Sequence, residues 1–278
     1  MSPEDWRAEF KRAIDVPEDK INLARAALII ATDEYPDLDL DAQLARFDAF
    51  ARELAPIVAR NTTAREKIEG LNHFLFHHLS FHGNREDFYD PRNSYLNDVL
   101  DRRVGLPITL SIVYIEIARR LEMPIYGVGL PGQFIVKWFD DAAEIFIDPF
   151  NAGKILDEED LTRLVRDTYR ADAELDRAWL APVRAHYILT RMLNNLKEIF
   201  LQRDAFARAL LVTEKLLALD PNSEENLRDA GVIAYQAKQF KRAAEYLQEL
   251  LLHLPKTVEP DQIQQLINAA LKEMARWN

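Results

Sequence analysis

Three short stretches decide the fold of this chain: Arg103-Val104-Gly105-Leu106-Pro107, Leu130-Pro131-Gly132-Gln133-Phe134 and Ile147-Asp148-Pro149-Phe150. Pro107 suits the first turn of a helix, where its missing N–H costs nothing, and the apolar residues after it predict a buried helix to about Leu121. Pro131-Gly132 supplies the fixed φ and the positive φ that a type II turn needs. The sequence therefore predicts a core helix followed by short strands.

Three strands are predicted, at residues 125–130, 133–138 and 144–148, where β-branched and aromatic residues lie between turn signals. If the last two form an antiparallel hairpin centred on Asp140-Asp141, Gln133 stands opposite Asp148. That register would put two polar residues of the core side by side.

Helices are predicted on both sides of this region. From Pro3 to Phe81, apolar residues recur at helical spacing, and turn signals divide the segment into four helices. The charged stretch from Asp157 to Arg177 predicts a helix with a short break, and helix resumes from Leu180. The expected fold class is α+β, mostly α, in three parts: a helical N-terminal part (1–82), an antiparallel-sheet core (83–178) and a helical region (179–278).

The helical region contains an internal repeat. Its prolines, Pro221 and Pro255, follow similar leucine-rich segments and lie 34 residues apart, which is the tetratricopeptide period. Gly231 occupies the tight helix crossing of the second repeat, where the first has Lys197. Because about three repeats are normally needed to bury a continuous core, we expect the two repeats and a final helix (262–277) to lean on the rest of the protein or on a partner.

Composition excludes several classes of function. The formal charge of −11, with no basic block, argues against binding nucleic acid, whose affinity depends on Lys and Arg contacts to phosphates. We expect a cytoplasmic protein with no membrane association, because no secretory leader is apparent at Met1–Trp6 and no apolar run approaches the ~18 residues of a membrane span. The chain has no cysteine, which excludes disulfides, thiolate nucleophiles and cysteine-ligated zinc.

The segments Asp87 to Leu96 (DFYDPRNSYL) and Arg102 to Leu110 (RRVGLPITL) give the chain a family resemblance. It resembles bacterial transglutaminase-like proteins with C-terminal tetratricopeptide repeats, of the Sir-B invasion-regulator type, over roughly residues 40–278. The Pro-Gly-x-Phe and Ile-Asp-Pro-Phe motifs and the repeat occur in that family's order. A similar segment occurs in a eukaryotic F-box protein that recruits substrates to a ubiquitin ligase, which favours a role in recognition.

The resemblance implies a transglutaminase-like (papain-like) core, but two of its three catalytic positions are altered. Counted back from Glu122, which replaces the glycine of a helix-to-strand turn, the cysteine position is Pro107. The histidine position is Gln133, and the aspartate is matched by Asp148. Proline has no nucleophile and glutamine has no proton that titrates near neutral pH, so the thiolate–imidazole pair is missing. The resemblance therefore implies a degenerate triad, in which Asp148 could accept a hydrogen bond from the Gln133 amide.

Two hydroxyls could replace the missing thiol. Thr109 and Ser111 lie in the first turns of the core helix, whose N-terminus favours an anion. No histidine occupies the matching position to activate them, and the capping or packing role of such hydroxyls is the favoured interpretation.

A polar and aromatic run precedes the core, and two interpretations stay open. Its members could line a pocket that faces Asp148, or they could satisfy the backbone of a buried loop through Asx-type hydrogen bonds. The run comprises Asn84, Tyr89, Asn93, Ser94 and Tyr95.

Four histidines, His73, His77, His78 and His82, fall on one predicted helix, and two pairs have the i, i+4 spacing of metal ligands. The pattern lacks the glutamate of a zinc peptidase, and no third ligand is evident. Structural histidines are favoured, and no metal or other cofactor is expected.

Two hypotheses follow. The favoured one is a non-catalytic interaction or regulatory protein, a pseudoenzyme that binds a protein or peptide partner through the core pocket or the repeat surface. The alternative is a hydrolase or acyltransferase of the same superfamily that uses Thr109 or Ser111 as nucleophile. The sequence names neither the partner nor the oligomeric state.

Overall fold

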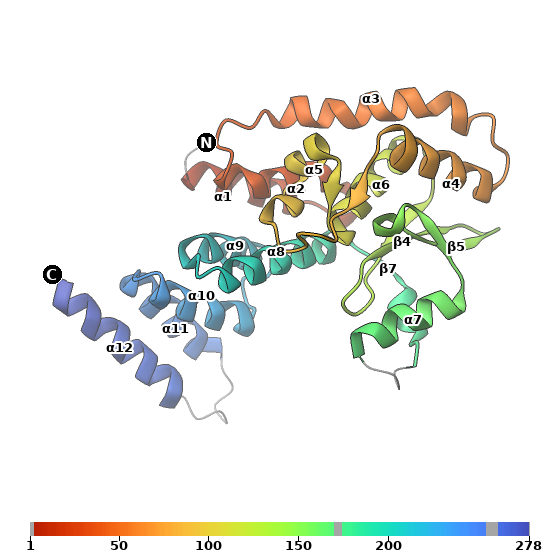
Figure 1. Ribbon diagram of the computed structural model, residues 1–278. Coiled ribbons are helices and arrows are strands. Elements are labelled where there is room, and N and C mark those ends of the chain that lie inside the picture. The colour runs from red at the N-terminus through yellow and green to blue at the C-terminus, as the bar shows by residue number, and fades with distance from the viewer. Residues whose placement is uncertain (1–2, 170–173, 254–260, 278) are drawn as a thin grey trace. The chain divides into compact units, whose positions relative to one another are not determined.

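The computed structural model describes residues 3–169, 174–253 and 261–277 (Figure 1). Helices dominate, and one five-stranded antiparallel sheet lies in the middle of the chain, so the α+β, mostly α class is confirmed. Within these residues, no helix combines the length and the apolar composition that crossing a bilayer requires.

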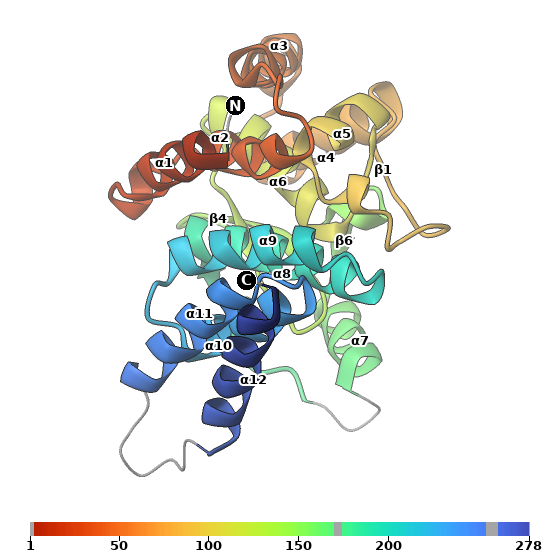
Figure 2. The same ribbon diagram turned by 90° about the vertical axis from the view of Figure 1, so that its left-hand side faces the viewer.

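Four α-helices precede the core, as the sequence predicts, and the fourth continues into the π-helix η3 (His73–His78). Side-chain oxygens of Asn22, Asp39 and Thr63 accept backbone N–H groups at the starts of the second, third and fourth helices. The third helix, seen nearly end-on at the top of Figure 2, packs against its two neighbours and the core helix. The elements are α1 (Pro3–Ile14), η1 (Glu18–Lys20), α2 (Leu23–Ile30), η2 (Ala31–Asp33), α3 (Leu40–Val58) and α4 (Ala64–Asn72).

The core helix α6 (Pro107–Arg120) begins at Pro107 and ends close to the predicted residue. Two short parallel strands, β1 (His82–Gly83) and β2 (Val104–Gly105), pair with each other. Because β2 immediately precedes α6, this pairing holds residues 82–83 beside the start of α6. Glu122, just after α6, has φ +55°, the left-handed conformation in which glycine is favoured. The remaining elements here are η4 (Pro91–Asn93) and α5 (Leu96–Arg102).

The main sheet has the strand order β6-β5-β4-β3-β7, and all neighbours are antiparallel. The three predicted strands are present, and two further short strands extend the sheet at its edges. The predicted turn at Pro131-Gly132 is also present, since Gly132 has φ +66° and the Gln133 N–H donates to the Leu130 carbonyl at 3.2 Å. The strands are β3 (Ile125–Val128), β4 (Ile135–Phe139), β5 (Glu144–Asp148), β6 (Lys154–Leu156) and β7 (Pro182–Val183).

Helices cover both faces of the sheet. The helix α6 packs against β3 and β4, and alternate residues of the strands point to the opposite face. On that face Ile135 and Leu156 share an apolar cluster with Leu161 and Val165 of α7 (Glu158–Tyr169) and with Leu180 of η6 (Arg177–Leu180). Residues 170–173, inside the charged stretch where a helix break is predicted, lie outside the described residues.

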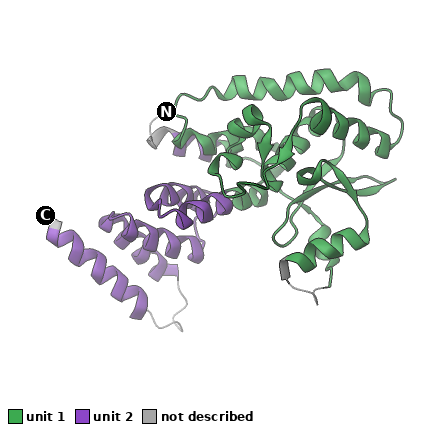
Figure 3. Cartoon of the chain, viewed as in Figure 1, with its two compact units in different colours: residues 1–2, 13–192 green, residues 3–12, 193–278 purple. Residues whose placement is uncertain are grey.

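The chain divides into two compact units, coloured separately in Figure 3: unit 1 comprises residues 13–192, and unit 2 comprises residues 3–12 and 193–278. Gly231 lies where α10 crosses α11, and a Cβ there would stand 2.5 Å from Leu247 Cγ, as the repeat pattern requires. Pro255, the second repeat proline, lies outside the described residues. The helices are α8 (Ala185–Gln202), α9 (Phe206–Leu219), α10 (Glu224–Gln236), α11 (Phe240–His253) and α12 (Asp261–Trp277).

The N-terminal segment 3–12 completes unit 2. Trp6 and Phe10 are buried there, and the Lys215 ammonium lies 3.7 Å from the centroid of the Trp6 ring. Arg7 pairs with the buried carboxylate of Glu214. The repeats thus bury apolar surface against a helix from the other end of the chain.

Candidate functional site

The start of α6 places Pro107 and Thr109 in buried positions. The Thr109 hydroxyl accepts the Leu106 N–H at 2.9 Å and donates to the Asn93 carbonyl at 2.8 Å. It therefore caps its own helix and ties the helix to the preceding loop.

Ser111 lies one turn beyond Pro107 on the same side of the helix, because residues four apart share a face. Its side chain is fully buried, and its hydroxyl has no hydrogen-bond partner among the described residues. No described acid or base therefore contacts this hydroxyl to activate it.

The hairpin register differs from the expected one. Val136 pairs with Ile147, so Asp148 stands opposite Ile135, and Gln133 lies in the turn before β4. The cause is Asp140, whose carboxylate accepts the N–H groups of Ala142 and Ala143 in an Asx-type turn. This turn moves the centre of the hairpin one residue further along the chain, and the predicted pairing of residues 133 and 148 is wrong.

Asp148 is buried, and its own turn uses both of its carboxylate oxygens. Oδ1 accepts the N–H groups of Phe150 and Asn151 at 3.0 and 3.2 Å, and Oδ2 accepts from the Asn151 side-chain amide at 2.5 Å. In the described part of the chain, no hydrogen bond joins Asp148 to the Gln133 amide. The carboxylate caps the 3₁₀ turn η5 (Pro149–Asn151).

Gln133 is held through its backbone. Its carbonyl accepts from the Arg191 guanidinium at 3.4 Å, and the Leu130 carbonyl accepts from the same group at 3.2 Å. Arg191, on α8, thus fixes the Pro-Gly turn. No local pattern predicts this contact, because 58 residues separate Arg191 from Gln133.

Two asparagines organise the polar run before the core. The Asn93 amide donates to the Asp87 carbonyl at 2.8 Å, and its oxygen accepts from Asn84 at 3.1 Å, while the Asn84 oxygen accepts the Asp87 N–H. Ser94 is buried, and its hydroxyl has no partner among the described residues. The side chains of the two asparagines are hydrogen-bonded to each other. The Asn93 backbone carbonyl also accepts from the Thr109 hydroxyl.

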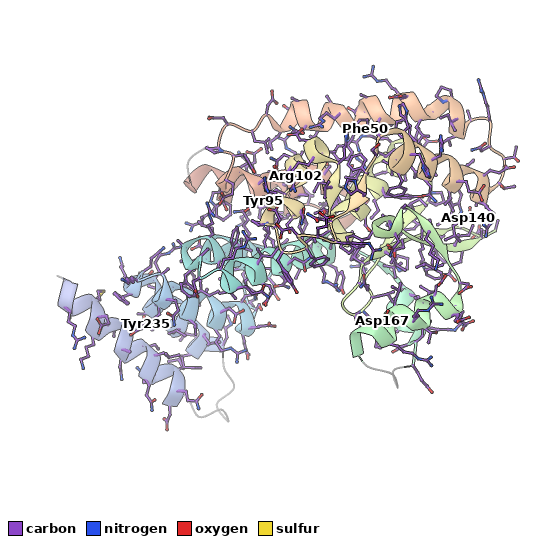
Figure 4. The ribbon with its side chains drawn as sticks, in the orientation of Figure 1. Phe50, Tyr95, Arg102, Asp140, Asp167 and Tyr235 are labelled. Carbon is purple, nitrogen blue, oxygen red and sulfur yellow. The ribbon has the colours of Figure 1, made fainter. Side chains whose placement is uncertain are left out.

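The aromatic members of this run face different surroundings. Tyr95, labelled with Arg102 at the two ends of α5 in Figure 4, is buried and packs edge-on against Tyr35. Tyr89 is 53% exposed and packs on Phe88, which in turn packs on Phe150 of the Asp148 turn.

Two contacts near this turn were missed at the level of sequence. Arg85 pairs with the Asn151 side chain and lies over the Phe150 ring, so it joins the loop to the turn that Asp148 caps. Asp90 is buried and pairs with Arg92 and Arg102. Burial would raise the pKa of the Asp90 carboxyl, but the hydrogen bonds from Arg92 and the charges of both arginines outweigh it and hold the pKa below its usual value.

The four clustered histidines do not share one helix. Ser80 takes a left-handed conformation (φ +61°), and His82 lies in β1, which ends the predicted i, i+4 relation with His78. His73 stacks on His77, and the His78 ring nitrogen lies 2.9 Å from the Glu53 carboxylate. Across the described residues, no group of three or more His, Asp or Glu side chains is arranged to hold a metal ion.

Comparison with known proteins agrees with this architecture. A family model described as transglutaminase-like superfamily matches residues 41–194, and one described as tetratricopeptide repeat matches residues 196–268. The chain belongs to the transglutaminase-like superfamily. Since the chain contains no cysteine, this superfamily member has no cysteine nucleophile.

Relatives of this transglutaminase-like chain occur in bacteria and in eukaryotes. It is 37% identical over 251 residues to a UPF0162 protein of Xylella fastidiosa strain Temecula1, and the alignment covers 89% of each chain. It is 28% identical to a UPF0162 protein of Vibrio cholerae, over 90% of this chain and 93% of the relative. Human F-box only protein 21 is 34% identical over 46% of this chain and 21% of its own length. No solved structure is significantly similar to the chain.

Proposed function

We propose that this protein is a non-catalytic interaction protein on a degenerate transglutaminase-like scaffold. One observation carries the proposal: the positions of the nucleophile and the base hold Pro107 and Gln133, while both oxygens of the matching Asp148 accept hydrogen bonds from their own turn. Without a nucleophile and a base, covalent acyl transfer at these positions has no first step.

Neither nearby hydroxyl is a ready substitute. Thr109 donates its proton to a backbone carbonyl, and Ser111 is fully buried, so a substrate carbonyl could reach neither without rearrangement of α6. A buried, unactivated hydroxyl is a weak nucleophile.

The histidine next to the core does not supply a base. His82 is exposed, and its Nδ1 lies 3.1 Å from the Ser80 carbonyl. Gly83, the next residue of β1, faces Phe150 of the Asp148 turn, since a Cβ there would lie 2.5 Å from that ring. Successive residues of a strand point to opposite sides, so the His82 ring is directed away from the turn.

The repeat unit offers the first binding surface. Val232 on α10 and Leu266 on α12 are 38% and 37% exposed, and they lie 34 residues apart, which is the period of the repeat. Equivalent positions in a solenoid face the same side. An exposed apolar residue that recurs with the repeat is suited to the apolar side chains of a bound peptide.

The core offers a second surface. Phe88 is 40% exposed and packs on Phe150, and Tyr89 is 53% exposed and packs on Phe88. Arg85 lies over the Phe150 ring. Exposed aromatics beside an arginine are typical of contact surfaces between proteins. This surface adjoins the turn of Asp148, the residue that the resemblance matches to the catalytic aspartate.

Labelling with a fluorophosphonate probe tests the absence of catalysis. We expect no covalent adduct on Thr109 or Ser111 in the native protein, measured by mass spectrometry of the intact chain. Stoichiometric labelling that disappears in T109A or S111A would establish the alternative, a hydrolase or acyltransferase with a substitute nucleophile.

Capture of partners from bacterial lysate tests the interaction role. The variant Val232→Asp puts a charge on the repeat surface, and Val16→Asp makes the same change at a valine that is 39% exposed in unit 1. We expect V232D to lose specific partners that the native chain and V16D both retain, quantified by mass spectrometry. If the native chain retains nothing specific, or if V232D and V16D retain the same partners, the repeat surface has no such role.

A further inference from the structure

A groove of unit 1 lies on the α7 side of the sheet, between the strands β5 and β6 and the elements α7 and η6. Its apolar wall consists of Phe146, Leu156, Leu161, Leu175 and Leu180, and its volume is about 120 Å³. Its rim carries Glu144, Asp157, Glu158 and Arg177. We call it the acidic groove. The aspartates labelled in Figure 4, Asp140 and Asp167, belong to the β4–β5 hairpin and to α7, the two elements that flank it.

Each of the three carboxylates of the rim accepts hydrogen bonds through only one of its two oxygens within the described residues. Glu144 pairs with Lys137 through Oε1, Asp157 caps α7 through Oδ1, and Glu158 pairs with Arg177 through Oε1. Within the described residues, the second oxygen of each accepts no hydrogen bond. Lys137 offsets Glu144, and Arg177 offsets one of the other two carboxylates, so the rim keeps one negative charge and its chemistry favours a cation.

The same wall already accommodates one lysine of the chain. Lys137 is buried, its ammonium lies 2.6 Å from Glu144, and its nitrogen lies 4.5 and 5.5 Å from the ring centroids of Phe139 and Phe146. A lysine side chain pairs a carboxylate with its charged end and packs its alkyl chain on apolar surface. The acidic groove, which Phe146 also lines, presents a carboxylate and an apolar surface again.

The charge of the whole unit points to the same kind of partner. Residues 13–192 contain 21 lysines and arginines against 31 aspartates and glutamates, so −10 of the formal charge of −11 belongs to unit 1. A net negative charge attracts positively charged partners and speeds their encounter.

We propose that the acidic groove receives a lysine side chain from a basic segment of a partner protein. The alkyl chain lies against the leucines and Phe146, and the ammonium lies among the three carboxylates. This inference rests on the proposed interaction function and specifies the chemistry of the partner. It concerns a surface different from the repeat residues Val232 and Leu266.

The inference is tested by titrating the full chain with lysine whose backbone amino and carboxyl groups are both blocked, followed by nuclear magnetic resonance. We expect saturable shifts in the methyl signals of Leu175 and Leu180. We expect Glu158→Gln to weaken binding about threefold, the usual effect of one exposed charge. Glu159→Gln is the matched control, because Glu159 is the next residue of α7 but does not line the groove. The same probe acetylated on its ammonium group should not bind.

Three results would overturn the inference: no saturable shift with the lysine probe, equal shifts with the acetylated probe, or equal weakening by E158Q and E159Q. The measurement needs no cellular partner, so it can fail while partner capture succeeds. Conversely, if lysine binds but no partner is captured, the groove is a lysine-binding site and the proposed interaction function is contradicted.

Discussion

Two carboxylate-bearing regions of unit 1 use their oxygens in opposite ways. At the degenerate triad, both carboxylate oxygens of Asp148 accept hydrogen bonds from its own turn. The side chains of Thr109 and Asn93 donate hydrogen bonds to backbone carbonyls. At the acidic groove, Glu144 and Glu158 each keep an oxygen that no described group of the chain occupies. A polar group whose bonds are filled from within mainly stabilises the fold, whereas one with free acceptors is available to a ligand. Side-chain substitutions in the two regions should therefore affect different properties.

The largest effect is expected at Asp148. Asp148→Ala removes three accepted hydrogen bonds from a buried turn, and we expect the free energy of unfolding to fall by about 2–4 kcal/mol. Urea denaturation followed by tryptophan fluorescence measures it. Asp148→Asn keeps one acceptor oxygen and should recover part of the loss. A variant D148A as stable as the native chain would mean that the cap is dispensable, and the contrast between the regions would disappear.

The hydroxyls of Thr109 and Ser111 allow the same comparison within one helix, between a hydrogen-bonded group and one without a described partner. Thr109→Val removes a hydroxyl that makes hydrogen bonds of 2.9 and 2.8 Å, and we expect a loss of about 1–2 kcal/mol. Ser111→Ala removes a buried hydroxyl without a described partner, so it should be neutral or slightly stabilising. Denaturation curves of the two variants, measured together, check this. A large loss in S111A would reveal a bond or a role for that hydroxyl that its surroundings do not explain.

The sequence predicts the scaffold of the degenerate triad well, because local rules govern it. Pro107 has a fixed φ that suits a helix start, Gly132 tolerates the positive φ of its turn, and the helical repeat is a pattern in the sequence itself. The resemblance aligned Glu122 with a glycine of the family, and the structure gives this residue a positive φ.

What the sequence could not predict depends on contacts between distant residues or on one competing turn. The hairpin register was decided by the Asx turn of Asp140, and the left-handed Ser80 removed His82 from its helix. The docking of Trp6 in unit 2 joins two ends of the chain. The acidic groove likewise forms only when the sheet brings Glu144 beside α7. Neither periodicity nor a local motif records such contacts.

A smaller effect, which depends on pH, is expected at Asp90. Its pKa is held below the usual value, so its carboxylate stabilises the fold above about pH 4 and loses that contribution as pH falls through the lowered pKa. Asp90→Asn should therefore cost about 1 kcal/mol near pH 7 and progressively less below pH 4. Unfolding free energies of the native chain and D90N, measured from pH 7 to pH 3, give this difference. Asp87→Asn, in the same loop, is the control, and a cost that does not change with pH would contradict the assignment.

The smallest effect on stability is expected at the acidic groove. Glu158→Gln removes a charge whose carboxylate makes one exposed ion pair with Arg177, so the free energy of unfolding should change by less than about 0.5 kcal/mol. Glu159→Gln should give a similar small change, because both residues lie in the first turn of α7 and interact with its dipole. The two variants would then agree in stability and differ in lysine binding, which separates a ligand-binding role from support of the helix. If E158Q instead destabilises the protein as much as T109V, the glutamate stabilises the fold, and the two regions use their polar groups alike.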